Sequence, residues 1–129
     1  MTSDRLTQLR TLLALVEKAE GPDRELDYAL FAYFAIPEAP NHWHPTVGNH
    51  FTDSIDAAVS LIERLIPEMC WSVSRYQLGH HALVNASLWV VGRMDETEIA
   101  VKLVDSTPPL ALLSALFRAL IAKEGGDAV

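Results

Sequence analysis

The feature that most constrains the fold is a block in which two amphipathic helical segments bracket three strand-like segments. The helical segments are residues 52–66 and 107–123. Between them, residues 70–77, 82–91 and 97–104 show the two-residue side-chain period of β-strands. Gly79 and Gly92 lie in the short intervening turns. The block therefore predicts an α+β fold of order α-β-β-β-α with a three-stranded antiparallel sheet.

Two further helices are predicted ahead of this block, at residues 4–19 and 23–35. Gly21 and Pro22 separate them, and Asp23 caps the second. Neither helix is large enough to bury its own apolar stripe. The middle strand is apolar on both faces, which predicts cover on both sides of the sheet. We expect the two helices to cover the second face, giving an α/β/α sandwich, with a homodimer through one face as the competing arrangement.

The chain length and apolar content predict one domain. The chain has 129 residues, of which 50% are hydrophobic, enough for a single core. Within it we distinguish a helical pair at residues 1–35, a loop at 36–50 and the block at 51–123. The loop contains Pro37, Pro40, Pro45 and Gly48 and has no apolar period, so it is also the expected place for a site.

Charge and cysteine content exclude several classes of function. The formal net charge is -7, from 17 acidic and 10 basic residues that form no basic patch. Binding to nucleic acid or to an anionic membrane surface is therefore disfavoured. Cys70 is the only cysteine, which excludes an intrachain disulfide and a multi-cysteine zinc site. The polar N-terminus has no signal-peptide pattern, so we expect a cytoplasmic protein.

Three short motifs carry a family resemblance. They are Phe51-Thr-Asp-Ser-Ile-Asp-Ala-Ala at the start of a helix, Trp71-Ser-Val at the start of the sheet and Thr107-Pro-Pro-Leu-Ala-Leu-Leu at the start of the last helix. With them, residues 51–123 resemble the phage ABA sandwich domain, a group of uncharacterised phage and prophage proteins. The last motif is close to the family's Thr-Pro-Ala-Leu-Ala-Leu, from which Pro109 departs. The resemblance implies a helix-sheet-helix sandwich and a phage origin in a bacterial host cell, but transfers no site residues.

The same order of elements is similar to that of double-stranded RNA-binding domains. Gly79-His80-His81 falls at the first hairpin, where those domains have a histidine-containing loop. However, they grip phosphates with lysines at the start of the last helix. Here that position reads Thr107-Pro108-Pro109-Leu110, so we do not expect RNA binding.

The loop histidines are the sharpest candidates for chemistry. In an extended segment, His42 and His44 point to the same side, and His50 follows six residues on. Together they supply three of the four ligands of a zinc site. The competing interpretation is a polar loop whose histidines face water, because no cysteine or helical His-x-x-x-His pair accompanies them. Trp43, between the first two histidines, is either an exposed anchor for a protein partner or a lid folded over the core.

Other reactive residue types have simpler structural explanations. Asp53 and Asp56 lie one helical turn apart, where acids cap a helix and complement its dipole. His80 and His81 sit in a turn, where adjacent side chains point to opposite sides and chelate poorly. Cys70 has no activating neighbour in sequence, and the strand serines lack the sharp Gly-x-Ser-x-Gly turn of a hydrolase.

These observations favour a non-enzymatic, phage-derived accessory protein that acts by contact with a protein of host or phage origin, without a cofactor. Trp43 is the candidate partner contact. The alternative is a metal-binding module or a small metal-dependent enzyme built on His42, His44 and His50.

Overall fold

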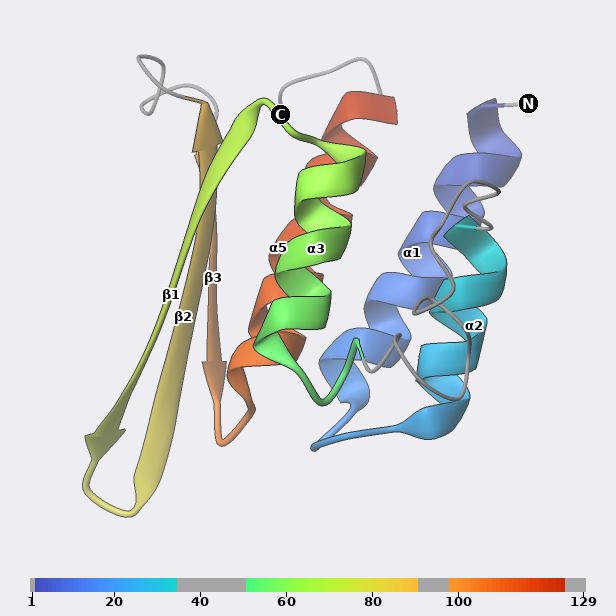
Figure 1. The fold of residues 1–129 in the computed structure, drawn as a ribbon. Coiled ribbons are helices and arrows are strands. Elements are labelled where there is room, and N and C mark those ends of the chain that lie inside the picture. Colours follow the sequence, from blue (N-terminus) through green and yellow to red (C-terminus); the bar gives the residue numbers. More distant parts are fainter. Residues whose placement is uncertain (1, 35–50, 91–97, 125–129) are drawn as a thin grey trace.

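A computed structural model describes residues 2–34, 51–90 and 98–124. Helices and strands follow one another as the sequence predicts, with the last five forming the order α-β-β-β-α (Figure 1). The elements are α1 (Thr2–Lys18), α2 (Arg24–Phe34), α3 (Ile55–Leu65), β1 (Met69–Leu78), β2 (His81–Val90), β3 (Ile99–Val104) and α5 (Pro108–Glu124). The predicted α+β class is confirmed.

The three strands form one antiparallel sheet in the order β1-β2-β3. β1 and β2 pair without a bulge from Met69 opposite Val90 to Leu78 opposite His81. Gly79 and His80 make the two-residue turn between them, and Gly79 has a φ of 62°. Glycine at the first central position with positive φ is what a type II′ hairpin turn requires, so the turn fixes this register.

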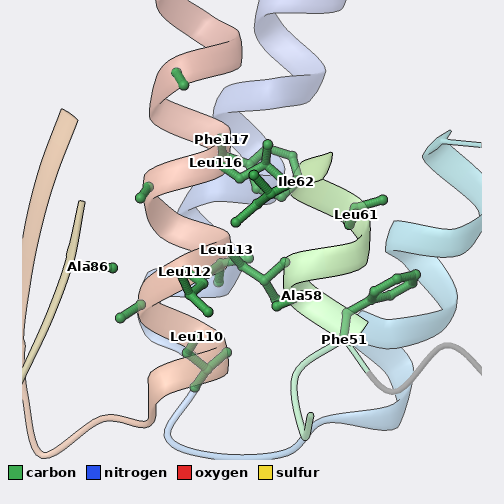
Figure 2. Packing of buried hydrophobic residues seen from close by; sticks show 14 of the residues in the cluster. Phe51, Ala58, Leu61, Ile62, Ala86, Leu110, Leu112, Leu113, Leu116 and Phe117 are labelled. Atoms are coloured by element: carbon green, nitrogen blue, oxygen red, sulfur yellow. The ribbon is translucent and has the colours of Figure 1, made fainter. Parts of the chain in front are cut away.

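Helix α5 forms the centre of the core. Between residues 109 and 120 every side chain except Arg118 is buried. One side of the helix contacts the sheet, where alternate residues of β2 from Ala82 to Leu88 are buried, and other sides contact α1 and α3 (Figure 2). A helix that is apolar around most of its circumference must be enclosed. The last helix of the block is therefore buried, apart from Arg118, over residues 109–120.

The predicted position of the two N-terminal helices is wrong. Figure 1 shows the four described helices on the same side of the sheet, with α1 and α2 farther from it than α3 and α5. α1 packs along α5, and α2 lies against α1. The physical reason is that α5 has apolar surface to spare, so Leu9, Leu12 and Val16 of α1 are buried on a helix rather than on strands. The layers are therefore sheet, helix and helix, and the described helices leave the second face of the sheet uncovered.

A polar contact fixes α1 against α5. The Ser114 hydroxyl, buried on α5, donates to Glu17 Oε2 of α1 at 2.7 Å. Arg118, one turn further along, donates to the same oxygen through Nε at 3.1 Å and Nη2 at 2.5 Å. Because the carboxylate accepts from both residues, the buried hydroxyl keeps a partner and the relative position of the two helices is specified.

Candidate functional site

The predicted metal and partner residues all belong to the segment between α2 and α3. His42, Trp43, His44 and His50 fall within residues 35–50, outside the described residues. The zinc site and the Trp43 contact therefore stay predictions. Within residues 2–34, 51–90 and 98–124, no group of three or more His, Cys, Asp or Glu side chains is placed to hold a metal ion. Metal analysis of untagged protein, compared with His44→Ala, tests the loop directly.

A histidine and a carboxylate meet at the hairpin end of the sheet. His81 Nδ1 lies 2.7 Å from Oδ2 of Asp105, the residue that follows β3. The other carboxylate oxygen accepts the Ala82 backbone N–H at 3.0 Å, and the Asp105 N–H donates to the Ala82 carbonyl at 2.7 Å. The Ala82 N–H first, and then His81, lower the pKa of Asp105 below its ordinary value. The ionised carboxylate thus orients the imidazole.

This pair resembles half of a catalytic triad, in which a carboxylate orients a histidine base. The other half requires a nucleophile on the second ring nitrogen. Among the described residues, no hydroxyl or thiol hydrogen-bonds to the His81 ring. The side chains of His81 and Asp105 are 66% and 54% exposed, so water competes for both. The geometry supports a structural role for this pair, in which it holds the end of β3 against the start of β2, rather than a role in a reaction.

The pair of Asp53 and Asp56 also lacks the geometry of a reaction centre. Asp53 and Asp56 are both exposed, and no hydrogen bond joins them. The sequence suggests Thr52 or Asp53 as the cap of α3, and this prediction is wrong. The cap is Ser54, whose hydroxyl accepts the Ala57 N–H at 3.2 Å. Thr52 cannot take that role because its own polar atoms are engaged with α2.

A buried carboxylate on α2 organises the start of α3. Asp27 has no exposed surface, and its Oδ1 accepts the Thr52 backbone N–H at 2.8 Å. Its Oδ2 accepts from Arg24 Nη1 at 3.3 Å, and the Arg24 guanidinium lies 5.0 Å from the Tyr28 ring centroid. The Thr52 hydroxyl accepts the Asp23 N–H at 2.8 Å. Sequence reasoning missed this network, because Asp27 and Thr52 are 25 residues apart and only folding brings them together.

An open groove of about 460 Å³ runs between the end of α1 and the start of α2. Its lining combines the apolar Leu15, Leu26 and Ala29 with the charged Lys18 and Glu25. Asp23 also lines it, but one of its carboxylate oxygens accepts the Leu26 N–H at 3.1 Å as the cap of α2. The groove therefore offers a shallow apolar floor without a set of converging polar groups.

The side of the sheet that the described helices leave uncovered is a further candidate surface. We define the outer face as the strand residues that point away from α5. They are Cys70, Ser72, Ser74, Tyr76, Leu78, His81, Leu83, Asn85, Ser87, Trp89, Ala100, Lys102 and Val104. The centre of the outer face is polar, and the formally charged side chain among these thirteen residues is that of Lys102. None of these described strand residues is acidic, and the Asp105 carboxylate meets the face only at its hairpin end, through His81.

Apolar side chains gather at the hairpin end of the outer face. Tyr76, Leu83 and Val104 are directly opposite one another in the register of the three strands, with Leu78 beside them. Tyr76 is 43% exposed, Leu78 56% and Val104 60%. Directly opposed side chains on a sheet lie about 5 Å apart, so these residues form one patch. The Tyr76 hydroxyl accepts from Asn85 Nδ2 at 3.2 Å, which holds the ring over the sheet.

The other candidate nucleophiles are ordinary sheet residues, as predicted. Ser72 and Ser74 belong to β1 and Ser87 to β2, all on the outer face. Cys70 is half-buried and lies opposite the half-buried Trp89. A thiol packed beside an indole in this way behaves as a small apolar side chain.

Comparison with protein-family models, with curated proteins and with solved structures finds no match to this chain. The resemblance to phage ABA sandwich proteins therefore remains an expectation from three motifs. Among the described residues, none of the helices is long and apolar enough to cross a lipid bilayer.

Proposed function

We propose that the protein is a non-enzymatic protein-binding module whose docking surface is the hairpin end of the outer face. The observation that carries this proposal is the exposure of Tyr76, Leu78 and Val104 in one patch. Exposed apolar side chains that are scattered singly are common, whereas a contiguous group that includes an aromatic ring is typical of a protein interface.

The chemistry of the patch favours a particular kind of partner. Leu83 and Val104 offer apolar contact, and Lys102 lies two residues from Val104 on the same face. The pair of His81 and Asp105 borders the patch on its other side. A matching partner is a protein surface with an apolar centre and a carboxylate placed to meet Lys102. This charge pattern also disfavours nucleic acid, because one lysine neutralises few phosphates.

The resemblance to phage proteins suggests the cellular context in which this binding takes place. In that setting the protein is a small accessory protein in the cytoplasm of a bacterial host, and its partner is of host or phage origin. Trp43 is a second candidate contact, in the segment outside the described residues. Trp43→Ala therefore belongs in the same binding experiment.

The test is capture of proteins from bacterial lysate with the full chain in three forms, wild type, Val104→Glu and Ile55→Glu, with Trp43→Ala measured beside them, followed by reconstitution with the purified candidate. Val104→Glu places a charge in the patch, and we expect it to lose the partner. Ile55→Glu is the matched control, because Ile55 is 39% exposed and lies in the first turn of α3, where an acid is favourable. If a partner binds all three forms with the same affinity, the outer face is not the docking surface.

A further inference from the structure

We propose that a second copy of the chain pairs antiparallel along the free edge of β1, so that two three-stranded sheets form one six-stranded sheet. β1 is an outermost strand of the sheet, and its ten residues pair one-to-one with β2. Natural edge strands are normally blocked by proline, lysine, an inward-pointing charge or a bulge. β1 has no proline, lysine, acid or bulge. Its one charged residue, Arg75, is on the α5 side of the sheet but is exposed near the hairpin end, where the core does not enclose it. It is therefore an open template for another strand.

The opposite edge of the sheet is protected. β3 has six residues against ten in β1, and Lys102 is exposed near its middle. Asp105 follows it with a φ of 55°, which turns the chain away from the strand direction. Short length and a lysine are two of the features that prevent strand addition. The asymmetry between the two edges points to β1 as the pairing edge.

The hydrogen-bond pattern shows which backbone groups of β1 face outward. The Asp105 N–H donates to the Ala82 carbonyl at 2.7 Å, so the backbone of Ala82 faces β3. In an antiparallel ladder this direction alternates from residue to residue. Gln77, the β1 partner of Ala82, is therefore not hydrogen-bonded to β2 at that position. Every second residue of β1 then directs its N–H and C=O to the free edge, namely Trp71, Val73, Arg75 and Gln77.

A contact at the start of β1 agrees with this alternation. By the same count the Met69 N–H points away from β2, and it donates to the Ile66 carbonyl at 3.0 Å. No strand among the described residues pairs with the outer edge of β1. The outward groups of the four residues are thus available to a strand from another molecule.

The sequence of β1 is complementary to itself in one register. A two-fold axis perpendicular to the sheet at Val73 places Val73 opposite Val73 of the second copy. On the same face, Trp71 then lies opposite Arg75 of the second copy, an aromatic-cation pair. On the outer face, Ser72 lies opposite Ser74 of the second copy, a hydroxyl pair of the kind that stabilises sheets. No pair in this register opposes like charges.

The net charge favours this edge for self-association. The chain carries a formal charge of -7, so two copies repel one another over most of their surfaces. β1 contains no acid and one arginine, which makes its edge a place where two acidic molecules meet without opposed carboxylates. The pairing would place two outer faces side by side on one sheet. It does not depend on the proposed function, because Val104 lies on β3 at the other edge.

The first test measures the mass of the full chain by sedimentation equilibrium across a range of concentrations. We expect twice the chain mass of 14.3 kDa for the wild type. Arg75→Pro removes an outward N–H without removing a bond to β2, and we expect it to be a monomer. Arg75→Ala keeps that N–H and loses only the two symmetry-related contacts with Trp71, so it should dimerise about five- to thirtyfold more weakly.

Circular dichroism melts establish that both variants fold, which separates loss of the dimer from loss of the structure. A wild type that sediments at the mass of one chain at all concentrations would overturn the proposal. So would a folded Arg75→Pro variant that remains dimeric, because the dimer would then use another surface, such as the outer face.

The second test identifies the register by disulfide formation. In a Cys70→Ser background, Ser72→Cys and Ser74→Cys together place two thiols opposite each other across the two-fold axis. Residues opposite one another in a non-hydrogen-bonded pair have Cα atoms about 4.5 Å apart, within the range of a disulfide. We expect oxidation to link the double variant into a dimer, with mass spectrometry locating the 72–74 bond. Equal crosslinking of either single variant, or none in the double variant, contradicts the register.

Discussion

At the scale of single residues, the buried carboxylate of Asp27 connects two helices that are distant in the sequence. It accepts the Thr52 N–H in the core and is paired with Arg24, which is partly exposed. Burial of a charge is unfavourable unless it is hydrogen-bonded and paired, and Asp27 is both. The residue thus couples the start of α3 to α2 across the segment that separates them in sequence.

Asp27→Ala should be strongly destabilising. The substitution leaves the buried Thr52 N–H without an acceptor, and we expect it to lower the free energy of unfolding by about 2–3 kcal/mol. Urea unfolding followed by circular dichroism measures the change. Glu63→Ala, at an exposed position of α3, is the control and should change stability by less than about 0.5 kcal/mol. Equal effects of the two substitutions would show that the network contributes little.

Asp105 should make part of the stability of the protein depend on pH, through its contacts at the end of the sheet. Its pKa is lowered in the folded state by the Ala82 N–H and by His81. A depressed carboxylate pKa contributes stability above the pKa of the unfolded chain, and this contribution is lost as the pH falls through the folded value. Asn at this position tolerates the left-handed backbone, so Asp105→Asn removes mainly the charge.

We therefore expect wild type to be more stable than Asp105→Asn at pH 6, with the difference shrinking as the pH is lowered from about 5 towards 2. Urea unfolding at a series of pH values measures both proteins. A difference that is constant over this range would mean that the Asp105 carboxylate has the same pKa in the folded and unfolded chain.

At the scale of elements, α5 is the centre of the fold because the other main parts of the core pack against it. The sheet, α1 and α3 all pack against this helix. Leu110, Ala111 and Leu112 are successive residues of α5 and all are fully buried, although successive side chains of a helix point about 100° apart. The helix is thus buried on sides that a helix with one apolar stripe would expose to water. The position of α5 explains why α1 does not reach the sheet.

Truncation of a central α5 side chain should therefore be costly. Leu113→Ala is expected to lower the free energy of unfolding by about 3 kcal/mol, through lost burial and the cavity that remains. Leu15→Ala in α1 removes the same atoms from a side chain that is 46% exposed, and should cost less than about 1 kcal/mol. Thermal and urea unfolding of the two variants provide the comparison. A similar loss in both would contradict the central role of α5.

At the scale of the whole molecule, the described helices lie on one side of the sheet and leave the outer face open. Val101 and Val104 belong to the same strand but to opposite faces. Val101 is 7% exposed beneath α5, whereas Val104 is 60% exposed on the outer face. The two residues therefore allow a direct test of the layer order.

Val101→Lys should prevent folding or cost more than about 3 kcal/mol, because it places an unpaired ammonium group in the core. Val104→Lys should remain folded, with a change of less than about 1 kcal/mol. Expression level, circular dichroism and urea unfolding measure both variants. If Val104→Lys unfolded the protein as Val101→Lys does, the outer face would have to be covered in solution.

The sequence by itself determined the elements and their order. The period of the apolar residues, Pro67 after the third helix, Gly79 in the hairpin and Pro108 at the start of α5 are local signals, and local signals specify where a helix or strand begins and ends. The register of β1 and β2 was not predicted, because the expected strands 70–77 and 82–91 left four residues for the turn, whereas Leu78 and His81 pair and the turn has two residues. The candidate histidines of residues 42–50 rest on local spacing alone and stay predictions.

The tertiary structure alone decided which surfaces meet. An apolar stripe indicates that one side of a helix is buried, but it does not indicate against what. The stripe of α1 could be buried equally well on a sheet or on α5. Packing of all the elements together places it on α5. The pairs formed by Asp27 with Thr52 and by His81 with Asp105 join residues 25 and 24 positions apart, which no local pattern encodes. The uncovered outer face and the open edge of β1 are consequences of that packing, and they are the surfaces on which the proposed contacts depend.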